Sequence, residues 1–380
     1  MVMKKMIFFL LFCASGLMAR AQAKQDTAFI HASYQIEITE QRIVAISWSD
    51  ILSKHPKLVP GNFRVLEQKS GTEIPYQLLY LGTNEPKNLL VKLTFEGPGA
   101  DIMIVQGKPA AFPLKTYGRY VPERKDDFAW ENDKIAFRMY GKALEGSSDN
   151  AFGMDVWAKR TDQLVIDKWY KSGDYHVDHG DGLDYYHVGF TLGAGDIAPY
   201  VNNAIVFPKN YRRWKVLDKG PLRFTFQLEY DGWDVAGKTV SMIKKISLDA
   251  GSQFNRVETT FDYGNDTASL PVVIGIVKRK EPGVINLNEK RGIMSYSEPE
   301  HGKDGVMNLG TILVSAKPEG MLVSDSHLLT VVKAKSRQPV VYYTGAVWSK
   351  SGTRIDNWAR YLDLRSLTDM LFNNISITVK

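Results

Sequence analysis

The residues best suited to chemistry gather in one short segment, residues 174–187. It reads Asp-Tyr-His-Val-Asp-His-Gly-Asp-Gly-Leu-Asp-Tyr-Tyr-His and holds three of the seven histidines of the chain. Histidine changes its protonation near neutral pH, tyrosine can transfer a proton from a well-placed hydroxyl group, and glycine lets the backbone approach a ligand closely. This mixture of side chains indicates proton-transfer chemistry.

The candidate catalytic residues of this segment are His176, His179, Tyr185, Tyr186 and His187. If residues 185–188 are extended, Tyr185 and His187 share one face of the backbone, and Tyr186 and Val188 take the other. A single histidine or tyrosine in a β-rich protein is usually a packing residue. A cluster of this kind favours a functional surface instead.

The same segment offers a metal site as an alternative. Its nitrogen and oxygen ligands would be His176, Asp178, His179, Asp181 and Asp184. Their spacing fits no standard zinc or calcium loop, so we expect no catalytic metal. Two of the aspartates could also act as the carboxylate pair of a glycoside hydrolase. That role depends on the distance between their carboxyl groups, which the sequence does not give.

Residues 117–131 form a second polar and aromatic segment. Arg119 and Arg124 can bind a carboxylate through paired N–H groups. The aromatic side chains that can stack on a sugar ring are Tyr117, Tyr120 and Trp130. The alternative is a turn-rich loop at a domain interface, with its arginines paired to Glu123, Asp126, Asp127 and Glu131.

The remaining polar features predict surface positions. Lys278-Arg279-Lys280 follows a predicted strand and is interpreted as a solvated strand end, and His301 lies in a glycine-rich loop. No Gly-x-Ser-x-Gly sequence is present, which argues against an acyl-transfer triad.

The first residues read as a signal peptide, residues 1–21. Lys4 and Lys5 precede a short apolar run, and Ala19-Arg-Ala21 is a small-residue cleavage site. We therefore expect a periplasmic protein without a membrane anchor. Its one cysteine, Cys13, leaves with the signal peptide, so neither a disulfide nor a thiol nucleophile is expected.

Charge and length narrow the function classes further. The formal charge of +6 falls to +3 without Lys4, Lys5 and Arg20. This mild excess does not predict nucleic-acid binding, and it is compatible with an acidic small substrate. The chain is long enough for two domains.

Alternating apolar residues predict strands along most of the chain. The predicted strands of the first part are 34–39, 62–66, 76–80 and 89–95, and those of the second are 134–140, 222–230, 240–248, 254–263, 272–277, 311–315, 328–334 and 340–346. These patterns predict an all-β fold, with a small N-terminal β-sandwich over residues 22–107 and a large antiparallel β-sandwich over residues 108–380. Gly193-Ala-Gly195 is interpreted as a turn.

One helix is predicted near residue 356. Asp356 is its candidate cap, and Trp358, Tyr361 and Leu362 share one face. Arg365 interrupts this apolar stripe, so we expect the helix to be short.

Two stretches carry a resemblance to a known family. Residues 174–195, from Asp-Tyr-His-Val-Asp-His-Gly-Asp-Gly-Leu-Asp through Tyr-Tyr-His-Val-Gly189 to Thr191-Leu-Gly-Ala-Gly195, and residues 117–131 resemble an exported bacterial family from polysaccharide-utilisation loci, known only as a domain of unknown function. The resemblance covers nearly all of the chain after the signal peptide. It implies a large sandwich like those of mutarotases and polysaccharide lyases.

The resemblance also implies an activity. Similar proteins include ulvan oligosaccharide dehydratases, which remove water from a uronic acid at the non-reducing end and leave a 4,5-unsaturated sugar. This reaction requires a cation for the carboxylate, a base for the C5 proton and an acid for the C4 hydroxyl, but no cofactor. On our reading Arg119 or Arg124 is the cation, His187 or His179 the base, and Tyr185 or Tyr186 the acid. A polysaccharide lyase, a glycoside hydrolase and a non-catalytic carbohydrate-binding protein remain alternatives.

Overall fold

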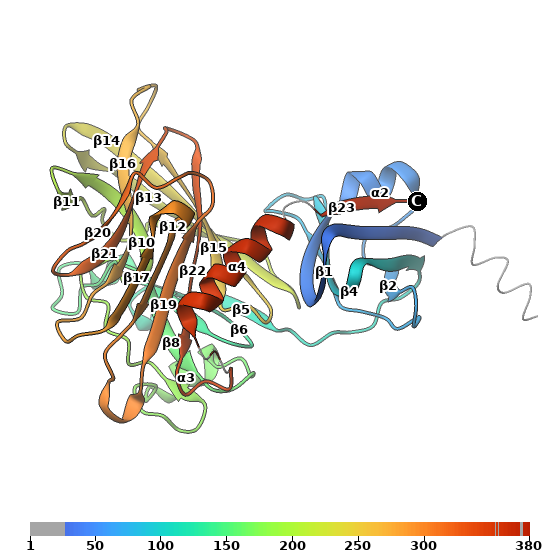
Figure 1. The fold of residues 1–380 in the computed structure, drawn as a ribbon, viewed down its shortest axis with the longest axis horizontal. Helices are drawn as coiled ribbons and strands as arrows, with labels where there is room; N and C mark the ends of the chain where they lie inside the picture. Colours follow the sequence, from blue (N-terminus) through green and yellow to red (C-terminus); the bar gives the residue numbers. More distant parts are fainter. Residues whose placement is uncertain (1–26, 354, 356, 373–374) are drawn as a thin grey trace, which may run out of the picture. The chain divides into compact units, whose positions relative to one another are not determined.

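The computed structural model describes residues 27–380 except 354, 356 and 373–374, so the expected signal peptide lies outside the described residues. Strands dominate, and all the named strand pairs are antiparallel, which confirms the predicted all-β fold class (Figure 1). The described chain forms two compact units. The first holds the residues up to Pro113 and those from Met370 onward, and the second is Leu114–Asp369. The predicted boundary at residue 107 stays a prediction.

The first unit is built on one antiparallel sheet. Its elements are β1 (Thr27–Ser47), α2 (Trp48–Lys54), β2 (Phe63–Glu67), β3 (Tyr76–Leu79), β4 (Asn88–Gln106) and β23 (Ser376–Val379). The long strands β1 and β4 pair along their length, β2 and β3 pair with different halves of β4, and β23 pairs with β1. Apolar side chains of these strands, among the residues whose burial is described, face one apolar core, which Trp48 and Ile51 of α2 complete. The sequence predicted parts of four of these strands but not β23.

The second unit contains three sheets. The eight-stranded sheet runs β12 (Arg213–Asp218), β13 (Arg223–Val235), β14 (Lys238–Asp249), β15 (Phe254–Asp262), β22 (Pro339–Trp348), β19 (Met307–Leu313), β18 (Ile293–Ser297) and β17 (Val284–Asn288). One five-stranded sheet runs β11 (Ala204–Ile205), β10 (Ala194–Val201), β16 (Leu270–Val277), β21 (His327–Ala334) and β20 (Gly320–Val323). The other runs β5 (Thr116–Val121), β6 (Asp127–Asn132), β7 (Ala136–Met139), β8 (Asp155–Lys159) and β9 (Gly182–Leu183).

The three sheets share one hydrophobic core. Apolar side chains of the eight-stranded sheet pack against those of both five-stranded sheets. Along β14 and β15 every second residue is buried, as expected for strands with one face on the core. All residues of β6, β7 and β8 are buried, because α3 (Ile166–Ser172) and its neighbouring residues cover their second face.

The predicted C-terminal helix is confirmed as α4 (Trp358–Phe372), which extends beyond the interruption expected at Arg365. Trp358 and Leu362 are buried against Phe254 of β15, and the rings of Trp358 and Phe254 stack at 5.6 Å. Asp356, the predicted cap, lies outside the described residues. No helix in the described part of the chain has the length and apolar character that a membrane span requires.

Two predicted loops are strands instead. Residues 117–131 contribute most of the β5–β6 hairpin, with a short 3₁₀ helix, η1 (Pro122–Arg124), at its turn. Gly195 lies within β10 rather than in a turn, and its φ of +105° and lack of a side chain let β10 approach Thr344 of β22. The other 3₁₀ helices are η2 (Lys142–Leu144), η3 (Glu289–Arg291) and η4 (Gly302–Asp304).

His327, the first residue of β21, is a buried hydrogen-bond acceptor. Its Nε2 accepts the backbone N–H of Leu192 at 3.1 Å, and burial lowers the pKa of His327 to about 4. The unfolded chain binds a proton here near pH 6.5, so the stability from the neutral imidazole is full above that pH and is lost as the pH falls toward 4.

We therefore expect His327→Gln to weaken the fall in the free energy of unfolding between pH 6.5 and 4, by about 1.4 kcal/mol per pH unit at most. Urea unfolding at a series of pH values measures it. Equal slopes for the variant and the wild-type protein in this range would contradict the assignment.

Candidate functional site

A cavity of about 590 Å³ in the second unit brings together the residue types that the sequence singled out. Its walls come from three places: the segment after β9, the residues after β16, and the loop between β18 and β19 that contains η4. The lining residues are Tyr185, His187, Arg279, Glu281, Glu298, Pro299, Glu300, His301, Gly302, Lys303 and Asp304. Two cavities of the first unit are smaller, at about 190 and 180 Å³.

The segment after β9 presents alternate side chains to the cavity. Tyr185 and His187 line it, whereas Tyr186 and Val188 are buried in the core. This is the arrangement that the period of two predicted for an extended segment. His187 is exposed and therefore accessible to a ligand.

Arg279 supplies the guanidinium group of the cavity. Its Nε donates to Glu298 Oε1 at 2.6 Å, its Nη1 donates to the carbonyl oxygen of His187 at 2.7 Å, and its guanidinium lies 4.7 Å from the ring centroid of Tyr186. Burial raises the pKa of Glu298, although Arg279 opposes the shift. These bonds to the described residues use Nε and Nη1, so Nη2 remains to meet a ligand.

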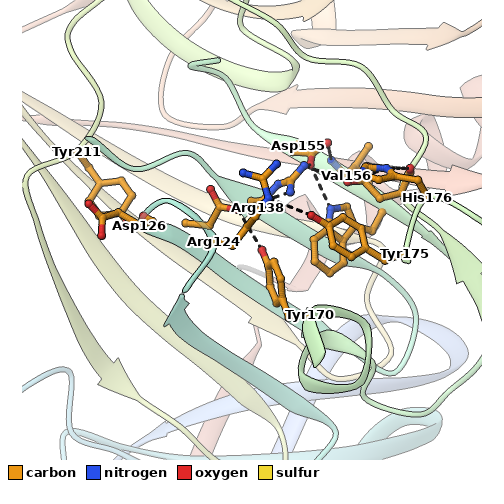
Figure 2. A network of polar contacts seen from close by, with 12 residues as sticks. Arg124, Asp126, Arg138, Asp155, Val156, Tyr170, Tyr175, His176 and Tyr211 are labelled. Carbon is orange, nitrogen blue, oxygen red and sulfur yellow. Dashed lines mark hydrogen bonds and ion pairs between the residues drawn. The ribbon is translucent and has the colours of Figure 1, made fainter. Parts of the chain in front are cut away.

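A second arginine, Arg138, fixes the start of the same segment. It lies on β7 directly opposite Asp155 of β8, and its Nε and Nη2 donate to Asp155 Oδ2 at 2.9 and 2.6 Å. Nη2 also lies 3.0 Å from Oδ2 of Asp184, the residue before Tyr185. Asp127 of β6 lies 3.5 Å from Nη1. Figure 2 shows this buried cluster, with Tyr170 and Tyr175 beside it.

The cluster is buried because of how the three strands alternate. Residues 127, 138 and 155 share the face of the sheet that α3 covers, while their neighbours Phe128, Phe137 and Val156 face the central core. Burial raises the pKa of Asp127 to about 6. Burial and the nearby Asp155 raise the pKa of Asp184 well above its ordinary value, although Arg138 opposes the shift.

The other two histidines of the segment lie outside the cavity lining. His176 Nδ1 is 2.7 Å from the carbonyl oxygen of Asp184, and His179 Nε2 is 3.0 Å from Asp174 Oδ2. The aspartates considered as metal ligands are paired with cations: Asp178 with Arg160, Asp181 with Lys168, and Asp184 with Arg138. Within the described residues, no three His, Cys, Asp or Glu side chains are grouped to hold a metal ion.

The predicted substrate-binding residues 117–131 also lie apart from this cavity. Arg119 donates to Asp167 and Glu123, each at 2.7 Å, and Arg124 Nε donates to the hydroxyl of Tyr175 at 3.1 Å.

The aromatic residues of that segment serve packing. Trp130 is fully buried and donates to Asn255, Tyr117 packs beside α3, and Tyr120 stacks on Trp214 at 5.3 Å. Of the acidic partners considered for these arginines, Glu123 pairs with Arg119.

The sequence predicts surface positions for Arg279 and His301, and in the structure both residues line the cavity. The one local signal was the position of Arg279 directly after a buried strand. Its partners, His187 and Glu298, come from distant parts of the chain, so periodicity could not reveal the contact.

Comparison with known proteins places the chain in a family. Residues 35–370 match the family described as "Domain of unknown function (DUF4861)". The chain belongs to the DUF4861 family. A relative from Formosa agariphila, named "Uncharacterized protein P7", is 35% identical over 269 residues, which cover 65% of this chain and 66% of that protein.

Solved structures resemble the DUF4861 chain in fold alone. A protein of glycosyl hydrolase family 38 from Enterococcus faecalis superimposes with a TM-score of 0.50 and 8% identity, over 97% of this chain and 50% of the other. An alpha-mannosidase from Enterococcus faecalis V583 gives 0.49 and 8%, over 97% and 48%. The chain thus spans about half the length of these enzymes.

The buried Arg138 cluster predicts losses of stability of different size for two substitutions. Arg138→Met removes the cation that Asp155 and Asp127 require, so we expect a loss of about 3–5 kcal/mol in the free energy of unfolding. Burial disfavours the charged form of Asp184, and the substituted asparagine would keep an oxygen for Arg138 Nη2, so the cost of Asp184→Asn should stay within about 1 kcal/mol. Denaturant unfolding followed by tryptophan fluorescence measures both. A larger loss for Asp184→Asn than for Arg138→Met would contradict this ranking of the two residues.

Proposed function

We propose that this protein is an exported carbon–oxygen lyase. The proposed reaction removes water from the uronic acid at the non-reducing end of an ulvan-type oligosaccharide. The C5–H and C4–O bonds break, a C4=C5 double bond forms, and one molecule of water leaves. The observation that carries the proposal is the presence of His187 and Arg279 in one open cavity.

Arg279 takes the part first considered for Arg119 or Arg124. A guanidinium bound to the uronate carboxylate withdraws negative charge and makes the neighbouring C5 proton more acidic. Glu298 and the carbonyl oxygen of His187 hold Arg279 in place, which favours a fixed approach for the substrate. Arg279 is then the carboxylate partner.

His187 is the base in this proposal. It is the one candidate histidine of residues 174–187 among the cavity-lining residues, and its backbone is bonded to Arg279. A carboxylate on Arg279 would bring the adjacent C5 atom close to that side of the cavity. Tyr185 and His301 are the side chains that could protonate the departing hydroxyl group.

The charges of the cavity lining favour recognition of an acidic sugar through one ion pair. Four carboxylates, Glu281, Glu298, Glu300 and Asp304, outnumber the cations Arg279 and Lys303. Two of the four are already engaged, Glu298 by Arg279 and Asp304 by His301. An acidic sugar would therefore depend on the contact with Arg279 and not on an overall positive field.

Incubation of saturated ulvan oligosaccharides with the pure protein tests the reaction. A dehydratase gives new ultraviolet absorbance and a product lighter by one water, without chain shortening. Shortening with that absorbance indicates a polysaccharide lyase, and shortening without it a glycoside hydrolase. No change, together with measurable binding, indicates a carbohydrate-binding protein.

The role of His187 predicts the effect of its removal. His187→Ala should lower kcat at least about 10²-fold, because general-base catalysis is lost, while substrate still binds. Initial rates of absorbance increase and calorimetric binding measure the two effects. His31→Ala, in the first unit, is the control. Turnover by His187→Ala at the wild-type rate would place the base elsewhere.

The role of Arg279 predicts a dependence on substrate charge. Arg279→Lys should lower kcat/KM about 10²-fold on a free uronate, because one ammonium cannot replace the paired N–H groups. The loss should be smaller on the methyl ester of the same sugar, which has no charge to neutralise. Equal losses on the acid and the ester would contradict carboxylate binding by Arg279.

A further inference from the structure

The loop between β18 and β19 holds His301 in a defined position. The backbone N–H of His301 donates to the carbonyl oxygen of Gly305 at 2.9 Å, and that of Asp304 donates back to the carbonyl oxygen of His301 at 2.9 Å. Trp348 Nε1 donates to the carbonyl oxygen of Asp304 at 2.6 Å, which ties the loop to the end of β22. This loop is braced and can present a side chain accurately.

The His301 imidazole has the surroundings of an acid–base group. Its Nδ1 lies 3.1 Å from Oδ2 of Asp304, and its ring stacks on that of Tyr185 with centroids 5.2 Å apart and planes at 24°. The side chain is nevertheless 65% exposed. The contact with Asp304 orients the ring through Nδ1 and leaves Nε2 to exchange a proton with a ligand.

Tyr185 is less suited to give up a proton. Its hydroxyl oxygen is buried and has no hydrogen-bond partner in the described structure. Burial, with the negative charges of Glu298 and Asp304, raises the pKa of Tyr185 far above its usual range. A phenol in this state is a weak acid, and its ring serves better as a flat support for His301.

We propose that His301, oriented by Asp304, is the catalytic residue that protonates the departing C4 hydroxyl group. The inference rests on the proposed dehydratase activity and names its second proton-transfer group. His187 takes the C5 proton as the C4–O bond breaks, and the Nε2 proton of the His301 imidazolium goes to the leaving oxygen, which departs as water. Exchange with solvent then restores both imidazoles. Asp304 is a positioning residue.

A substrate whose leaving group needs no proton separates the two histidines. On a saturated uronate with a C4 hydroxyl group, His301→Gln should lower kcat/KM by about 10²–10³-fold. On the matching 4-deoxy-4-fluoro uronate, fluoride departs without accepting a proton, so the same variant should stay within about tenfold of wild type. His187→Ala should be impaired on both substrates, because C5 deprotonation is common to them.

Three further variants complete the experiment. Tyr185→Phe keeps the stacked ring and should stay within about tenfold of wild type on the hydroxyl substrate. Asp304→Asn should show the same pattern as His301→Gln but with a smaller loss. Its kcat/KM should fall on the hydroxyl substrate and recover on the 4-deoxy-4-fluoro substrate. His31→Gln alters another exposed His–Asp pair, His31 Nδ1 to Asp101 Oδ1 at 2.7 Å, and should leave kcat/KM unchanged.

Several results would overturn the inference. His301→Gln could retain wild-type kcat/KM on the hydroxyl substrate, or its kcat/KM could fall equally on both substrates. Tyr185→Phe could instead lose kcat/KM on the hydroxyl substrate and not on the 4-deoxy-4-fluoro substrate, which would make the phenol the acid. If wild-type protein forms no unsaturated product from either substrate, the proposed function itself fails, so the two failures are distinguishable.

Discussion

The burial of the Arg138 guanidinium group away from solvent is the constraint on which the candidate site depends. Arg138 is almost completely shielded, and the energy of removing its charge from water must be recovered from carboxylates in close contact. Asp155 lies directly across the strand pair, and Asp184 reaches the same cation from the segment that follows β9. This contact anchors Asp184 at the start of the segment that carries Tyr185 and His187.

Arg279 applies a related constraint at the other end of that segment. It binds the carbonyl oxygen of His187 and lies over the ring of Tyr186, so the short stretch between the two arginines has little freedom. The two cations differ in their surroundings. Arg138 is paired with acids inside the sandwich, whereas Arg279 reaches the cavity and keeps capacity for an anion. One arginine thus supports the backbone, and the other can meet substrate.

The sequence predicted what depends on local periodicity. Alternation identified most long strands and placed Tyr185 and His187 on one face, because a period of two is a property of the backbone. It did not identify the partners of these residues. Arg279 and His301 reach the cavity through strand pairings far apart in the sequence, and Arg119 finds Asp167 only after α3 packs on the sheet. The Gly193–Gly195 stretch was misread for a related reason: β10 requires small residues where it crosses β22, and a turn requires them too.

The pairing of β23 with β1 makes the small unit a discontinuous domain, interrupted by the whole of the large one. Residues 376–379 follow the whole of the large unit in the chain, so the edge of β1 that they cover stays open until the large unit has been synthesised. The entropy cost of bringing β23 to β1 grows only slowly with the length of the chain between them, and the large unit can fold first as a domain. A deletion of residues 376–379 therefore acts on β1, not on their nearest neighbours in sequence.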